Sequence, residues 1–410
     1  MTEQPAGSDS SSEASGTPPA VTVGLWAAFL ACSWTWCIGM FLPVVLLRDY
    51  GLWGFVIFAV PNILGAASIG WVIRSPEVAR RLLDRYRLAI GLFSAVTIAF
   101  HVYFLAWIGS WMPGVLGLDR MLVAWILAAS LAVFITMSVA TTRTLVVMSV
   151  PLWLLSGALV GTLIGIDTRT AAALPPPVID EAALLWLAPV MIFGFALCPY
   201  LDGTFLTARA SLSNSQAKAA FGLGFGVLFL AMIVGTVLYA PLLESTLGGH
   251  AVARWVGGLL LVHLLFQSIF TISAHRRVST LSAVPAPVLW VLLLVAAGGA
   301  ALATRLPDHA GLSAGEIGYK AFLVFYGLVF PAFVWLFMIP GRNTGTRGGG
   351  FQPPCQSRRR VLVFAGAVGI AMPMFWMGFI ERQEFFLVPG ILVVLLSRLM
   401  LETKAKISTG

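Results

Sequence analysis

Two histidines stand alone inside strongly apolar runs of the chain. His263 lies in LLLVHLLFQSIF, and His101 lies in IAFHVYFLAW. An ionisable group is costly in such surroundings, so it tends to mark an ion pathway or a proton relay. Imidazole changes its charge near neutral pH, which would let either histidine bind and release a proton. The alternative for each is a neutral ring that hydrogen-bonds to a neighbouring helix.

Four further polar residues lie in apolar surroundings. Asp202 is near the end of an apolar run, seven residues before Arg209, where it can pair with a basic residue, bind a cationic group or stand as a helix-end carboxylate. Gln267 lies one turn beyond His263, and Thr271 is among the hydroxyl residues further along that run. Buried amides commonly join helices by hydrogen bonds, which is the expected role of Asn62 and the alternative role of Gln267.

Signatures of enzymes and of metal sites are missing from the sequence. The four cysteines have no metal-ligand spacing, and neither His101 nor His263 has a flanking Cys, Asp or Glu at such a spacing. The glycine-rich stretch GRNTGTRGGG lacks the Lys-Ser/Thr that completes a phosphate-binding loop. We therefore expect no enzymatic activity, no cofactor and no metal.

The composition is that of a membrane protein. Of the 410 residues, 59% are apolar and 10% charged, against about a quarter charged in soluble domains. The mean hydropathy is +0.92. The net charge of +8 does not indicate a nucleic-acid partner, because the basic residues stand between apolar runs, where they set orientation in a bilayer. The expected fold class is an all-α polytopic membrane protein in contact with the lipid bilayer.

Apolar runs of about 20 residues predict about twelve transmembrane helices. They cover residues 24–47, 52–73, 88–111, 121–140, 144–166, 182–205, 219–241, 255–274, 283–303, 319–339, 361–380 and 385–401. The connection after the second run carries Arg74, Arg80, Arg81, Arg85 and Arg87, which places it in the cytoplasm. Threading from there puts both termini and most of the 25 basic residues inside, as expected for a bacterial-type inner (plasma) membrane protein.

The remaining segments follow from this threading. Residues 1–20 are rich in Ser, Gly and Pro and are expected to form a disordered cytoplasmic tail. A ten-helix core over 21–340 is followed by a cytoplasmic Gly/Arg-rich loop over 341–360, two peripheral helices over 361–401 and a short tail over 402–410.

The first and sixth predicted spans contain helix breakers next to polar residues. The first holds Gly39 and Pro43, and the sixth holds Gly194 and Pro199, at similar positions. These spans open two blocks of five helices, about 24–166 and 182–339, and an odd number of helices makes the second block enter from the opposite side. Interrupted helices at matching positions of inverted repeats point to a binding site at the membrane midplane. The alternative is a pair of ordinary kinks.

Aromatic and backbone groups beside these breaks are the candidate contacts for a ligand. Trp34, Trp36 and Tyr200 stand where aromatic rings would stack on it or occlude it. Carbonyl groups near Cys37–Met40 and Leu197–Tyr200 would be left without helical partners and are expected to bind the solute or its coupling ion.

Three stretches resemble sodium:solute symporters, of the amino acid–polyamine–organocation (LeuT-type) fold. One stretch resembles the family's first core helix and the turn into its second: SWTWCIGMFLPVVLLRDYGLWGFVIFAVPNILGA. Another resembles its basic link into the third helix, SPEVARRLLDRYR, and the last resembles the exit from its sixth helix, YLDGTFLTARASLSNSQAKAAFGLGF. The resemblance implies a five-plus-five inverted-repeat core, with substrate between helices 1 and 6 and helices 3 and 8 completing the cavity.

The resemblance implies a secondary active transporter that moves a small polar solute by alternating access. The family's sodium site uses adjacent hydroxyl residues in the eighth core helix, whereas the corresponding positions here are Leu261, Val262 and His263. Ser268 and Thr271 lie further along. This departure favours H⁺, bound by His263, over Na⁺ as the coupling ion.

Other classes of membrane protein predict different features. A major-facilitator carrier predicts a long loop between spans six and seven, where this chain has a short one. A membrane-embedded enzyme predicts polar clusters at one membrane face. A non-transporting sensor predicts ligand binding without flux.

Overall fold

The computed structural model describes residues 18–165, 176–244, 254–339 and 358–402. Most of the predicted N-terminal tail, most of the predicted 341–360 loop and nearly all of the predicted C-terminal tail lie outside these residues. The described residues are all-α apart from one isolated β-bridge between His309 and Leu312. Eleven of the described helices are long and apolar enough to cross a membrane, and the shorter α1 is also apolar. The protein is therefore a polytopic integral membrane protein.

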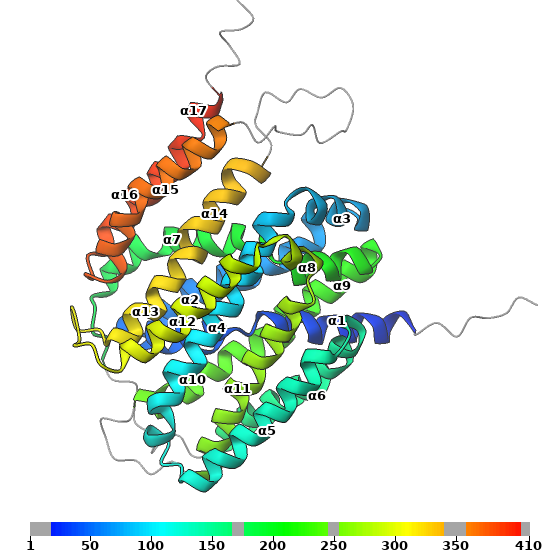
Figure 1. Cartoon of the computed structure of the whole chain (residues 1–410), viewed down its shortest axis with the longest axis vertical. Coiled ribbons are helices and arrows are strands. Elements are labelled where there is room, and N and C mark those ends of the chain that lie inside the picture. Colours follow the sequence, from blue (N-terminus) through cyan, green and yellow to red (C-terminus); the bar gives the residue numbers. More distant parts are fainter. Residues whose placement is uncertain (1–17, 166–175, 245–253, 340–357, 403–410) are drawn as a thin grey trace, which may run out of the picture.

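The helices follow one another along the whole chain (Figure 1). They are α1 (Pro19–Trp34), α2 (Cys37–Val72), α3 (Pro76–Arg85), α4 (Arg87–Val115), α5 (Arg120–Val139), α6 (Thr142–Gly165), α7 (Leu184–Leu197), α8 (Gly203–Ser211), α9 (Asn214–Leu223), α10 (Leu230–Glu244), α11 (Arg254–Arg276), α12 (Ala286–Ala303), α13 (Ala314–Val324), α14 (Phe330–Phe333), α15 (Arg358–Phe379), α16 (Leu387–Ser397) and α17 (Leu399–Glu402). Wider π-helical turns join some of them: η3 (Gly224–Phe229), η6 (Phe325–Val329) and η7 (Val334–Met338). Tighter 3₁₀ turns are η1 (Glu181–Ala183), η2 (Cys198–Leu201), η5 (Ser279–Ala283) and η8 (Glu384–Phe386).

The first predicted span is interrupted, but not at Gly39 or Pro43. The helix stops at Trp34 and restarts at Cys37, so Thr35 and Trp36 form the break. Side chains of these two residues bond carbonyls at the end of α1: Thr35 Oγ1 donates to Ala31 O at 2.8 Å, beside the backbone N–H of Thr35, and Trp36 Nε1 donates to Ser33 O. Polar side chains that replace helical hydrogen bonds thus set the position of this break, one turn before the glycine.

Helix α2 bends sharply at Gly51, which has φ +67° and ψ −159°. This left-handed conformation suits glycine, which has no Cβ to clash with the backbone. The bend frees the carbonyls of Arg48 and Asp49, which accept hydrogen bonds from the backbone N–H groups of Val178 (3.2 Å) and Ile179 (2.8 Å). The predicted spans 24–47 and 52–73 are therefore distributed over α1 and a long, bent α2.

The sixth predicted span is also interrupted. Helix α7 ends at Leu197, the 3₁₀ turn η2 carries Pro199, and α8 begins at Gly203. Asp202 caps α8: its Oδ1 accepts hydrogen bonds from the backbone N–H and the hydroxyl of Thr204, each at 2.7 Å. An aspartate at a helix N-cap supplies an acceptor for N–H groups that have no helical partner.

The helices pack in two groups with fewer contacts between them. Helix α2 packs on α7, α9 and α10, and α1 packs on α9, while α11 packs on α4 and α5, and α12 packs on α4. Helix α6 joins the two groups, because it packs on α1 and α10 and also on α11. Helices α15 and α16 lie side by side at one edge, where α16 packs on α7 (Figure 1). We call the end of the molecule that carries the basic 74–87 connection, which includes the amphipathic α3, the arginine-rich side, and the opposite end the far side.

Helices α2 and α7 cross in close contact at Gly65. A Cβ built at this position would lie 2.0 Å from the carbonyl oxygen of Phe195. The substitution Gly65→Ala should therefore push the helices apart and destabilise the protein by about 1–3 kcal/mol, as overpacking does. Gly157→Ala is the matched control, since a Cβ there meets nothing within 4 Å. The measurement is the melting temperature in detergent, and an equal response of the two variants would contradict a close crossing at Gly65.

Candidate functional site

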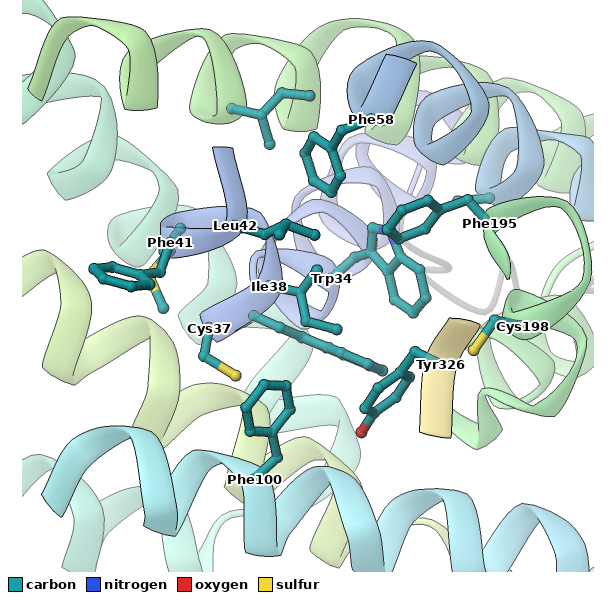
Figure 2. Packing of buried hydrophobic residues seen from close by; sticks show 14 of the residues in the cluster. Trp34, Cys37, Ile38, Phe41, Leu42, Phe58, Phe100, Phe195, Cys198 and Tyr326 are labelled. Atoms are coloured by element: carbon teal, nitrogen blue, oxygen red, sulfur yellow. The ribbon is translucent and has the colours of Figure 1, made fainter. Parts of the chain in front are cut away.

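The two interrupted helices meet at a small cavity of about 10 Å³, the central cavity. Its walls come from α1, α2, α7, the two breaks and η6. The lining residues are Trp34, Trp36, Ile38, Gly39, Asn62, Phe195, Cys198 and Tyr326. Figure 2 shows Trp34, Phe195, Cys198 and Tyr326 arranged around Ile38. The lining contains three aromatic rings besides Phe195 and no charged side chain.

Hydrogen bonds fix the aromatic rings of the central cavity. Trp34 Nε1 donates to Asn62 Oδ1 at 2.5 Å, which ties α1 to α2. The hydroxyls of Tyr326 and Thr97 are 2.9 Å apart, which ties η6 to α4. The indole ring of Trp36 makes edge contacts with the rings of Tyr326 and His275, at centroid distances of 5.4 Å each. The wall is preorganised because each polar tip of these rings has a partner.

The start of α2 is held at both of its first backbone polar atoms. The N–H of Cys37 donates to His101 Nε2 at 3.3 Å, and the carbonyl of Cys37 accepts from the hydroxyl of Tyr319 at 3.0 Å. His101 Nδ1 lies 2.7 Å from Thr97 O. One turn further on, Met40 O accepts from the hydroxyl of Tyr239 at 2.6 Å. His101 thus supplies a partner for an N–H group that no helix turn satisfies, and the tyrosines on α13 and α10 add bonds to carbonyls of the first turn of α2.

A second cavity of about 50 Å³, the far cavity, continues from the central one toward the far side. The two cavities share Ile38, Phe195 and Tyr326 in their linings. The far cavity has apolar walls from α2, α7 and α13, and polar groups at its far end: Asp49, Tyr50, Lys320, Arg382 and Glu384. A solute on this route would pass from charged groups to an aromatic chamber.

Charged side chains at the far end form one network, the ionic cluster, made of Arg48, Asp49, Glu316, Lys320 and Arg382. Arg48 donates to both carboxylate oxygens of Glu316, at 2.9 and 2.6 Å, and to Asp49 at 2.9 Å. Asp49, whose side chain is 1% exposed, also lies 3.6 Å from Lys320 Nζ and 3.4 Å from Arg382 Nη2. The cluster joins α2, α13 and the turn after α15, and buried carboxylates of this kind need such partners.

The turn after α15 is further anchored beside Arg382. Glu381 accepts hydrogen bonds from His309 at 2.9 Å and from Trp376 Nε1 at 3.1 Å. These bonds, with the one from His309 contributing most, hold the pKa of Glu381 below its ordinary value.

The arginine-rich side of the central cavity is closed by buried side chains. Arg209, 1% exposed, donates to the carbonyls of Ile73 (2.6 Å) and Leu212 (3.1 Å) and to Asn214 Oδ1 (2.6 Å). Tyr86 at the start of α4 donates to Phe337 O in η7 at 2.9 Å. These bonds join the 74–87 connection, α8, α9 and η7, so the cavities lead toward the far side and not toward this one.

Several residues singled out from the sequence lie at the central cavity or beside it. Trp34, Trp36 and Gly39 line it, and Cys37 begins the helix that bounds it. His101 contacts Cys37 from α4. Gly194 lines the far cavity, where its lack of a side chain lets α7 approach the carbonyl of Tyr326.

The other singled-out residues lie elsewhere. Pro199 forms part of the second break, and the hydroxyl of Tyr200 lies 3.4 Å from Ser68 Oγ on α2. Asp202 is buried as the cap of α8, and Arg209 makes its own bonds, so the expected pairing of these two is not formed. The carboxylate keeps one oxygen, Oδ2, without a hydrogen-bond partner among the described residues.

His263, Gln267 and Thr271 lie on α11, outside the lining of both cavities. His263 Nδ1 is 2.9 Å from Ser156 Oγ on α6, and Gln267 Nε2 donates to the same oxygen at 2.8 Å. Both therefore join α6 to α11. Thr271 is fully buried, and its hydroxyl has no partner among the described residues. In the described part of the chain, no three His, Cys, Asp or Glu side chains gather as a metal site.

Sequence reasoning missed the residues that come from distant segments. Tyr326 and Phe195 line the central cavity but look like ordinary members of apolar runs. The ionic cluster was also missed, although charges so close to the ends of apolar runs were a usable signal: Arg48 and Asp49 follow one run and Glu316 and Lys320 begin another.

We expect the Asp49 carboxylate to contribute most to the stability of the ionic cluster, because Arg48, Lys320 and Arg382 all lie against it. Asp49→Asn removes the anion that three cations share, and breaking a buried ion pair in this way should lower stability by about 3 kcal/mol. The control is Glu77→Gln, because Glu77 and Arg80 form a pair at 3.6 Å in which both side chains are more than half exposed. That control should change stability by less than about 0.5 kcal/mol. Thermal melts in detergent, with and without added salt, measure both, and a silent Asp49→Asn would contradict the cluster.

Comparisons with known proteins give no relative from which a function could be carried over. No family model, no curated protein and no solved structure matches this chain. The function is therefore argued from the two breaks, the two cavities and the ionic cluster.

Proposed function

We propose that this protein is a secondary active transporter that moves a small polar solute across the membrane by alternating access. The observation that carries the proposal is the meeting of two interrupted helices at one buried cavity. Non-helical backbone at membrane depth is tolerated where it is buried in protein or lines a cavity, and discontinuous helices are the usual way in which transporters build a midplane site.

The order of the elements supports an inverted-repeat core of the sodium:solute symporter-like, LeuT-type kind. In the first half, α1 and the start of α2 are divided at Thr35 and Trp36; in the second half, α7 and α8 are divided at η2. Five apolar segments separate the start of one broken unit from the start of the next. If α1 and the part of α2 before Gly51 are counted as one span, and the rest of α2 as the next, the chain has twelve spans. With the basic 74–87 connection in the cytoplasm, an even number of spans puts both termini there.

The packing supports a movement of two bodies. Helices α1, α2, α7 and α10 form one set of contacts and α4, α5, α11 and α12 another, with fewer contacts between the sets. Rocking of the first set against the second would close the far cavity and open a path on the arginine-rich side. The bonds made by Arg209 and Tyr86 are those that such a movement would have to break.

The central cavity favours a small neutral or zwitterionic solute. Its lining has no charged side chain, and its rings offer flat apolar surfaces together with a thiol and an amide. The N-terminus of α2 at Cys37 carries partial positive charge, which suits the electronegative end of such a solute. A solute with a net charge would find no charged side chain in this lining.

The other classes of membrane protein receive less support. A major-facilitator carrier would not need both breaks, and the link between α8 and α9 is short, with Ser213 capping α9 directly after Leu212. A membrane-embedded enzyme would use a polar cluster at one face; the ionic cluster is such a group, but its charges are paired with one another. A sensor with the same fold differs only in lacking flux.

The first experiment is a thermal-shift screen of the purified protein in detergent. Amino acids, sugars, ureas, nucleobases and carboxylates are tested with and without sodium, at about pH 5.5 and 7.5. A solute that binds only the folded state should stabilise it by about 2.7 kcal/mol at a hundred times its Kd. Trp36→Ala should abolish that shift, whereas Trp125→Ala, at a ring that is 69% exposed on α5, should keep it.

Flux then separates the transporter from the sensor. The solute that shifts the melting temperature is loaded into proteoliposomes, and its counterflow is measured for the native protein and for both Trp variants. Counterflow that depends on Trp36 and not on Trp125 is expected. Binding without counterflow would overturn the transporter and leave the sensor.

A further inference from the structure

We propose that His101 is the proton-binding site of this protein, and that protonation of its Nε2 releases the start of α2 from α4. The proposal names the coupling ion of the central cavity, so its meaning for transport rests on the proposed function. The observation that carries it is the hydrogen bond from the N–H of Cys37 to His101 Nε2, at the N-terminus of the second half of a broken helix.

Both ring nitrogens of His101 have partners with fixed roles. The carbonyl of Thr97 can only accept, so Nδ1 must carry a hydrogen, and the N–H of Cys37 can only donate, so Nε2 must be bare. The docked arrangement therefore requires the neutral ring with its hydrogen on Nδ1. The ring is fully buried, so water does not compete for either bond.

A proton on Nε2 is incompatible with this arrangement for two reasons. It would place two hydrogens between Nε2 and the amide nitrogen of Cys37, so that the bond is lost. It would also place a full positive charge at the positive end of the helix that begins at Cys37. Protonation and docking of α2 on α4 therefore exclude one another, and each proton bound favours the undocked helix.

The groups around His101 do not offset that charge. The Trp36 indole makes an edge contact with the His101 ring, at a centroid distance of 6.2 Å. The ionisable groups bonded to or packed on the same contacts are the thiol of Cys37, the hydroxyl of Tyr319 on Cys37 O, the hydroxyl of Tyr326 beside Thr97, and the ring of His275 against Trp36. Helix α12, which packs along α4, carries no titratable side chain. The carboxylate of Asp202, at the second break, is bonded through its Oδ1 to Thr204. No carboxylate forms a hydrogen bond with His101 in the described part of the chain.

The other buried histidines of the described chain lack this constraint. His263 and His275 each bond through Nδ1 to a serine hydroxyl, which can donate or accept, so neither ring is held to one protonation state. His263 joins α6 to α11 and bonds to no backbone group at a break. His101 is the histidine whose proton is linked to the position of a helix that lines the central cavity.

The test is hydrogen–deuterium exchange of the full-length protein in lipid nanodiscs across the range from about pH 8 to 5. Exchange of peptides that cover the start of α2 is converted to protection factors, which removes the pH dependence of the chemistry itself. Protection should fall by up to about tenfold per pH unit below about 6.5, the ordinary pKa of a histidine side chain in water. His101→Gln keeps an acceptor near the position of Nε2 but binds no proton, so its protection should stay constant.

His263→Gln and His275→Gln are the matched controls, and both should keep the fall seen in the native protein. A fall that survives in His101→Gln, or is absent from the native protein, overturns the proposal. A fall that disappears only in His275→Gln also overturns it and assigns the proton to α11. The readout requires no solute, so failure of the transport assay leaves this result unaffected.

A second variant keeps the proposal testable should His101→Gln fail to fold. Tyr319→Phe removes the bond to the carbonyl of Cys37 and leaves the histidine in place. Undocking then costs less, so the protection factor at the start of α2 should be lower than in the native protein at every pH, and it should still fall below about pH 6.5 because His101 is in place. Protection as high as in the native protein, or protection that no longer falls in acid, would contradict the link between His101 and the docking of α2.

Discussion

The positions of the breaks and of the bend in this protein depend on one constraint: a backbone polar group inside a membrane must find a hydrogen-bond partner within the protein. Two breaks and one sharp bend interrupt the helical hydrogen bonds, and at each of them other groups of the protein supply hydrogen bonds. Thr35 and Trp36 bond carbonyls at the end of α1, and Asp202 caps α8. Segment 176–180 takes the carbonyls freed at Gly51. The central cavity lies where such hydrogen bonds, and not regular helix turns, hold the backbone in place.

The arrangement of helices followed from local properties of the sequence, whereas its finest features did not. Apolar length predicted most of the spans, and the breakers in the first and sixth spans predicted that both are interrupted. Glycine and proline were poor guides to position, because Gly39 and Pro43 lie inside α2. The break lies at Thr35 and Trp36, where side chains offer better hydrogen bonds than the next helical turn would.

The candidate site shows the same limit. Residues next to the breaks, such as Trp34 and Trp36, were found because their own segment is unusual. Tyr326 and Phe195 were not found, because what makes them part of the cavity is the position of another helix. His263 stood out in sequence by its apolar neighbours, yet its partner is a serine on α6; the partner of His101 is the backbone of α2. The sequence reveals which groups are costly to bury, whereas their hydrogen-bond partners are set by how the helices pack.

The wall of the central cavity and the flexible point of the first broken helix are made of the same residues. Trp36 presents its ring to the cavity while its indole N–H donates to the carbonyl of Ser33 in α1. Trp34 also lines the cavity, and its indole N–H donates to Asn62 on α2. A solute that displaces either ring must also disturb the bonds that set the angle between α1 and α2. In the proposed transporter, the size of the solute is therefore coupled to the angle between α1 and α2, so that a substitution at either tryptophan changes both.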